Sequence, residues 1–251
     1  MDDPNKNKLN IISVLKRTIT IPIQRWKPLS LALIPSGIAM LVLDLVYVFG
    51  IVPDNSVTGS IYFILYSILL VIFAITCHRN ILMGGGSTTK YGVLKWSYRE
   101  WRYAGWAFIA YFYLYAFAAL GMFFASTLSS IIPGCNSTMF FIAFLAIAML
   151  PGIYVFARLS ILFPATAIEH KTTWNWAWDI TEGNGWRLVI IVGLFPALLS
   201  LVPAFLSGIN LAMDIVLLIA GLILLAVEII ALSVSFNELT KDHQPQIAES
   251  G

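Results

Sequence analysis

Residues 211–236 read LAMDIVLLIAGLILLAVEIIALSVSF, an apolar run whose only charged residues are Asp214 and Glu228. A helix needs about 20 mostly apolar residues to cross the hydrocarbon core of a bilayer, so this stretch is long enough to span a membrane. Five further apolar runs precede it, which gives predicted spans at 29–52, 60–77, 104–131, 137–157, 188–207 and 211–236. The sequence therefore predicts an all-α polytopic membrane protein with six transmembrane helices.

The composition supports the same class of protein. Of the 251 residues, 59% are hydrophobic and 11% are charged, whereas an ordinary soluble domain has about 25% charged residues. A soluble protein this apolar could not cover its own surface, so we expect the excess to face lipid in one membrane domain covering residues 1–251. The net charge of +2 and the lack of any nucleic-acid motif give no indication of nucleic acid as a partner.

The basic residues predict the orientation of the spans. All 15 Lys and Arg residues lie in the N-terminal arm, in the two long loops (79–103 and 158–187) or in the C-terminal tail. Cytoplasmic loops retain Lys and Arg, so we expect the long loops and both termini to be cytoplasmic.

Three amphipathic segments precede the three pairs of spans. We expect interfacial helices at 10–27, 91–103 and 173–183. An aromatic–basic pair lies at or just after the end of each: Trp26-Lys27, Trp101-Arg102 and Trp186-Arg187. The pattern suggests three repeats of an interfacial helix plus a helical hairpin. The alternative is that Trp, Lys and Arg simply prefer the membrane interface in any membrane protein.

Basic residues near the second loop are candidates for binding lipid headgroups. On a helix, Lys95, Arg99 and Arg102 would form one stripe beside an apolar stripe of Leu94, Tyr98 and Trp101. Together with His78 and Arg79 they could contact anionic phospholipid. The alternative is that these charges only orient the protein.

Two acidic residues fall within predicted spans, Asp44 in the first and Glu228 in the last. An intramembrane acid is costly and usually faces other helices or water. The functional interpretation is a proton or cation relay, and the structural one is an interhelical hydrogen bond. No catalytic motif, metal-ligand set or cofactor motif accompanies these acids, so we do not expect an enzyme, a metal or a cofactor.

Several stretches resemble bacterial six-span inner-membrane proteins of largely unknown function, which are related to the membrane domain N-terminal to some glycerophosphoryl diester phosphodiesterases. These stretches are residues 77–82 (CHRNIL), 157–160 (ARLS) with Pro164-Ala165 and Glu169, 177–187 (AWDITEGNGWR) and 233–239 (SVSFNEL). The resemblance implies a bacterial inner (plasma) membrane location. No phosphodiesterase domain is present in these 251 residues, so that activity does not carry over.

Two functions remain open from the sequence. We expect a non-catalytic membrane module that associates with lipid or supports a membrane-protein partner in envelope homeostasis. The alternative is a small secondary transporter or channel that uses Asp44 and Glu228. A transporter would need polar groups converging on a cavity near the midplane of the membrane, and the sequence supplies few.

Overall fold

The computed structural model describes residues 8–50, 56–84, 96–131 and 138–241, and every element in these ranges is a helix. In chain order they are α1 (Ile11–Gln24), α2 (Trp26–Val48), α3 (Ser56–Met83), α4 (Tyr98–Ile131), α5 (Thr138–Leu159), α6 (Leu162–Ala167), α7 (Trp174–Ile180), α8 (Gly185–Leu188), the π-helical segment η2 (Val189–Leu194), α9 (Phe195–Leu206) and α10 (Leu211–Thr240).

Six helical stretches are long and apolar enough to cross a membrane, at 26–48, 56–83, 98–131, 141–167, 185–206 and 211–240. The prediction of an all-α polytopic membrane fold is therefore confirmed. The helices extend beyond the predicted spans, since α3 continues past Cys77 to Met83 and α4 begins at Tyr98 instead of Ala104. The apolar run marks the part of a helix that suits lipid, whereas the helix itself continues for as long as backbone hydrogen bonds form.

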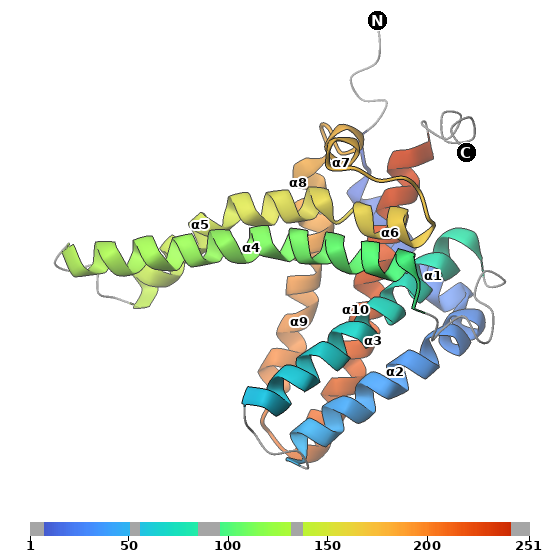
Figure 1. Cartoon of the computed structure of the whole chain (residues 1–251), viewed down its shortest axis with the longest axis horizontal. Coiled ribbons are helices and arrows are strands. Elements are labelled where there is room, and N and C mark those ends of the chain that lie inside the picture. The colour runs from blue at the N-terminus through green and yellow to red at the C-terminus, as the bar shows by residue number, and fades with distance from the viewer. Residues whose placement is uncertain (1–7, 51–55, 85–95, 132–137, 242–251) are drawn as a thin grey trace, which may run out of the picture.

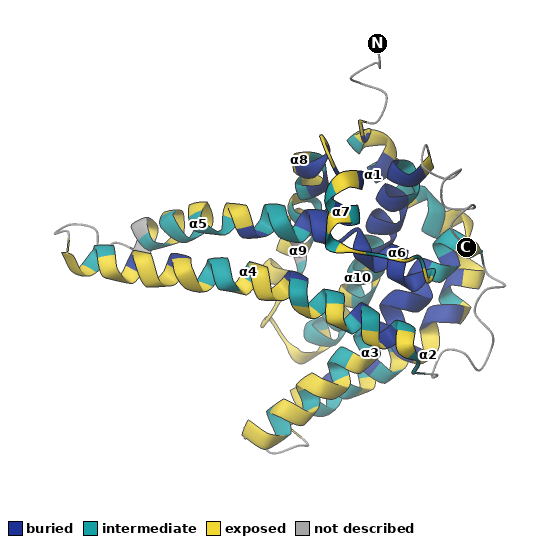
Figure 2. Ribbon diagram, turned by 45° about the horizontal axis from the view of Figure 1, so that its top comes forward, coloured by how far each residue is buried: buried dark blue, intermediate teal, exposed yellow. Residues whose placement is uncertain are grey.

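The spans form three helical hairpins: α2–α3, α4–α5, and α8–η2–α9 with α10. Figure 1 shows these hairpins diverging from one end of the molecule, where α1, α6 and α7 also lie. We call this region the packed end. Buried residues concentrate there, and the diverging parts of the hairpins are mostly exposed or intermediate (Figure 2).

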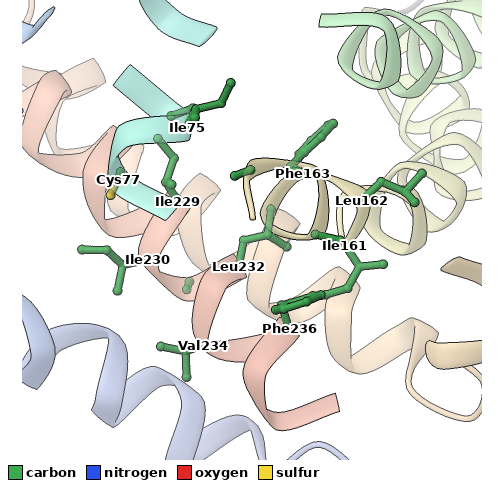
Figure 3. Close-up of a cluster of buried hydrophobic side chains, with 14 of the residues drawn as sticks. Ile75, Cys77, Ile161, Leu162, Phe163, Ile229, Ile230, Leu232, Val234 and Phe236 are labelled. Atoms are coloured by element: carbon green, nitrogen blue, oxygen red, sulfur yellow. The ribbon is translucent and has the colours of Figure 1, made fainter. Parts of the chain in front are cut away.

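The core of the packed end joins segments that are distant in sequence. All of α6 is buried, and so is every residue of α10 from Ile229 to Phe236. Figure 3 shows these segments together with Ile75 and Cys77 of α3. By contrast, large apolar side chains such as Leu31, Phe108 and Phe205 are exposed on the hairpins. Such a surface suits lipid and not water.

The predicted interfacial helices have different outcomes. The first corresponds to α1, which Asn10 caps by accepting a hydrogen bond from the Ser13 backbone, and the third corresponds to α7. The second prediction, a separate helix over 91–103, is wrong where the structure describes it, because residues 98–103 are the first turns of α4. Residues 91–95 lie outside the described residues. The relationship of the three hairpins as repeats stays a prediction.

Candidate functional site

A cavity of about 670 Å³ lies where the three hairpins diverge from the packed end. Its size falls within the range of small-molecule sites, roughly 300–1,000 Å³. Most of its wall is apolar and comes from α3, α4, α5, η2, α9 and α10, and the polar residues in it are His78, Tyr103, Tyr111, Ser160 and Glu228.

The cavity reaches the surface of the hairpins. Leu150 of α5 and Ile190 and Leu194 of η2 line it and are also exposed. These residues lie in helices that are long and apolar enough to cross a membrane. Val189, Val192 and Gly193 of the π-helical segment also line the cavity, and π-helical turns occur frequently at functional sites.

A hydrogen-bonded chain closes the cavity at the packed end. His78 of α3 is fully buried, with its Nδ1 atom 2.7 Å from the Ser233 hydroxyl of α10 and its Nε2 atom 3.3 Å from the Tyr103 hydroxyl of α4. The Ser233 hydroxyl donates to the Ile229 carbonyl at 2.9 Å, so it accepts from Nδ1–H. Nε2 is then the acceptor from Tyr103, which assigns the neutral Nδ1–H tautomer. The three side chains come from α3, α4 and α10, so His78 links the three hairpins.

Glu228 is the acidic residue of the cavity wall, and it is half-buried. Among the described residues it makes no hydrogen bond and no ion pair. It precedes the buried stretch of α10, which runs from Ile229 to Phe236, whereas the part of α10 before Glu228 is more exposed. An unpartnered carboxyl in apolar surroundings is costly, so this position favours a hydrogen-bonding ligand.

Asp44 has a different environment. It is buried between α2 and α3 and accepts a hydrogen bond of 2.6 Å from the Tyr62 hydroxyl. This is the interhelical hydrogen bond that the structural interpretation of Asp44 predicted. Asp44 does not line the cavity that Glu228 faces. The structure therefore does not bring the two intramembrane acids together.

The basic candidates bind protein groups where the structure describes them. Arg79 and Arg99 both contact the Glu169 carboxylate, at 3.4 and 3.0 Å, and Arg99 also pairs with Glu100 at 2.6 Å. Arg102 donates to the His170 carbonyl at 3.3 Å and to the Thr172 hydroxyl at 3.0 Å. These arginines therefore tie α3 and α4 to the connection between α6 and α7.

Two further outcomes complete the headgroup prediction. The prediction of His78 as a headgroup ligand is wrong, because its side chain is fully buried and both ring nitrogens bond protein hydroxyls. Lys95 lies outside the described residues. Of the predicted apolar stripe, Tyr98 and Trp101 are 77% and 66% exposed, and Leu94 lies outside the described residues.

Arg158 belongs to the ARLS stretch of the sequence, which predicted no role for it. Its side chain is 7% exposed, and its guanidinium carbon lies 3.8 Å from the centroid of the Trp178 ring. Nε donates to the Thr181 hydroxyl at 2.8 Å, and a second nitrogen donates to the Trp178 carbonyl near the end of α7. Within the described residues it has no carboxylate partner. The aromatic face and the carboxyl end of the helix stabilise its charge instead.

Comparison with protein-family models, with curated proteins and with solved structures gives no match. The resemblance to bacterial six-span inner-membrane proteins therefore stays a prediction. Within the described residues, no group of three or more His, Cys, Asp or Glu side chains could hold a metal ion. The fold defines the class, a six-span α-helical membrane protein, and the cavity between its hairpins is the candidate site.

Proposed function

We propose that this protein is a non-catalytic membrane module that binds a lipid in the cavity between its three hairpins. The observation that carries the proposal is the lining of the cavity, which is mostly apolar and whose polar residues include Glu228, Tyr111 and Tyr103. An amphiphile matches such a site, because its chain can contact the apolar wall while a hydroxyl or amine bonds the polar groups. The lateral opening at Leu150 and Leu194 gives access from the bilayer.

A non-catalytic role is supported by the hydrogen bonds of the histidine in the cavity. Both ring nitrogens of His78 bond protein hydroxyls, those of Ser233 and Tyr103. Neither nitrogen is left to take a proton from a bound molecule without breaking a buried hydrogen bond. His78 is therefore a residue that holds the hairpins together.

The proposed location is a bacterial inner membrane with the packed end and both termini in the cytoplasm. The support comes from the basic residues, because every described Lys and Arg lies in a segment at the packed end. Lys and Arg are retained on the cytoplasmic side. The proposed role is in envelope homeostasis, through bound lipid or a supported membrane-protein partner.

A cavity-filling substitution tests the proposal. Ala107 of α4 lines the cavity, so Ala107→Phe should remove lipid that co-purifies with the protein in polymer-bounded membrane discs. Gly105→Phe is the matched control, because Gly105 is exposed and a side chain there meets nothing within 4 Å. The measurement is the number and identity of bound lipids by native mass spectrometry. Equal lipid retention by both variants would remove the cavity as a lipid site.

The alternative is a small secondary transporter or channel, and the unpartnered Glu228 carboxyl is the observation that favours it. Glu228→Gln separates the two functions, because glutamine keeps hydrogen bonding but cannot exchange a proton. The lipid module should retain its lipid in this variant and show no proton flux in proteoliposomes. A proton-coupled flux that is present in the native protein and lost in Glu228→Gln would establish the carrier instead.

A further inference from the structure

Two hollows lie along the side of α10 that faces α1 and α2. The first is an apolar groove of about 450 Å³ lined mainly by α2 and α10, including Leu33, Gly37 and Ile223. The second is a polar pocket of about 330 Å³ lined by α1, α3 and α10. Its polar side chains are Arg17, Thr20, Gln24, Arg25, Ser233 and Asn237.

The two hollows follow one face of α10. The groove is lined by Ile219, Ile223, Ala226 and Ile230, at spacings of three and four residues, and the pocket continues the series with Ser233, Val234 and Asn237. Residues at this spacing share one face of a helix, and one turn rises about 5.4 Å. The polar pocket therefore begins about one turn beyond the end of the groove, on the side of the packed end.

The corner between α1 and α2 lies on the opposite wall of both hollows. Gln24 and Arg25 line the pocket, whereas Trp26 and Leu29 line the groove. The change from polar to apolar lining thus occurs within a few residues on this wall as it does on α10. Trp26 stands at that boundary, where tryptophan marks the depth of lipid headgroups.

The charges of the pocket favour an anion. Arg17 pairs with Glu238, whereas Arg25 is exposed and forms no ion pair with any described residue. The amide groups of Gln24 and Asn237 add donors that can bond phosphate oxygens. The pocket therefore has one uncompensated cation at the headgroup end of an apolar groove.

We propose that this α1–α2 corner binds one anionic glycerophospholipid, with its phosphate against Arg25 in the polar pocket and an acyl chain in the groove along α10. The site is separate from the central cavity and goes beyond the proposed function. Exposed Ile38 and Ile223 on the groove walls leave it open sideways, so that a lipid can enter from the bilayer.

Four variants of the full chain test the site. Binding is measured by native mass spectrometry during titration with phosphatidylglycerol or phosphatidylcholine. Arg25→Gln should weaken phosphatidylglycerol binding by about fivefold, the effect of one basic residue near an anionic headgroup. Phosphatidylcholine should weaken less, because its choline cation already offsets the phosphate charge. Lys16→Gln is the matched control, because it removes the same charge from an exposed position of α1 that does not line the pocket. Gly37→Phe fills the groove and should weaken binding of both lipids.

Each contrary result overturns the proposal. Equal weakening by Arg25→Gln and Lys16→Gln would mean that binding follows general surface charge, and this comparison decides the matter even if Gly37→Phe fails to fold. Undiminished phosphatidylglycerol binding by a folded Gly37→Phe would show that no acyl chain lies in the groove, and the pocket would then recognise a phosphate group alone. Ala107→Phe fills the central cavity and should leave the corner site intact. Loss of phosphatidylglycerol only in that variant would assign the lipid to the cavity and remove the corner site.

Discussion

The hydrogen bonds of His78 give the most quantitative prediction. Replacing His78 with Leu removes two buried hydrogen bonds, which at about 1 kcal/mol each predicts a loss of about 2 kcal/mol in the free energy of unfolding. The two bonds should contribute unequally, because the Nδ1 to Ser233 distance is 2.7 Å and the Nε2 to Tyr103 distance is 3.3 Å. Side-chain hydrogen bonds between membrane helices average about 0.6 kcal/mol and reach about 1.7 kcal/mol in double-mutant cycles. We expect the Ser233 pair near the upper value and the Tyr103 pair near the average.

Double-mutant cycles can measure both values. His78→Leu is combined with Ser233→Ala in one cycle and with Tyr103→Phe in the other, and unfolding in mixed micelles is followed through the fluorescence of the eight tryptophans. Tyr98→Phe is the control, since Tyr98 is exposed at the start of α4 and should not couple to His78. Zero coupling in both cycles, or a stronger coupling to Tyr103 than to Ser233, would refute the assigned chain of hydrogen bonds.

Three further outcomes follow from the other polar contacts. Arg158→Lys should lower the free energy of unfolding by about 2 kcal/mol, because lysine cannot donate to both the Thr181 hydroxyl and the Trp178 carbonyl while it stacks on the Trp178 ring. An unchanged stability would mean that only the positive charge matters. Asp44→Leu and Tyr62→Phe should be less than additive, since each removes the same hydrogen bond, and strict additivity would contradict the pairing. Burial and the nearby Arg102 lower the pKa of His170 below its ordinary 6.5. The stability that its neutral form contributes is therefore present above pH 6.5 and declines as the pH falls below that value. His170→Asn should lessen this loss of stability in acid, and a pH profile identical to that of the native protein would contradict the prediction.

The spans were predictable because they follow from a single physical length. Residues 211–236 alone contain enough apolar side chains to cross a bilayer, and the same reasoning located the other five spans. The structural interpretation of the sequence also predicted that Asp44 would form a hydrogen bond to another helix, because an intramembrane acid needs a polar partner. That this partner is Tyr62 depends on how α2 and α3 are aligned along their length, which the sequence alone does not determine.

The candidate site was less predictable, because it depends on contacts between distant parts of the chain. Arg99 looked like a free interfacial cation, but Glu169 lies next to it in the fold. His78 stands beside Arg79 at the end of an apolar run, and only the approach of α10 makes it a buried residue bonded to Ser233. The cavity has no sequence signal of its own, since its walls come from three hairpins that are each ordinary apolar helices.

The most direct test of the proposed function is a structure of the full chain determined without detergent, in a polymer-bounded disc of its native membrane. We predict elongated lipid density inside the cavity between α3, α4, α5 and α10, with a polar atom of the lipid within hydrogen-bond distance of the Glu228 carboxyl. Hairpins closed against one another, with Glu228 bonded to protein and lipid only on the outer faces, would contradict the proposal.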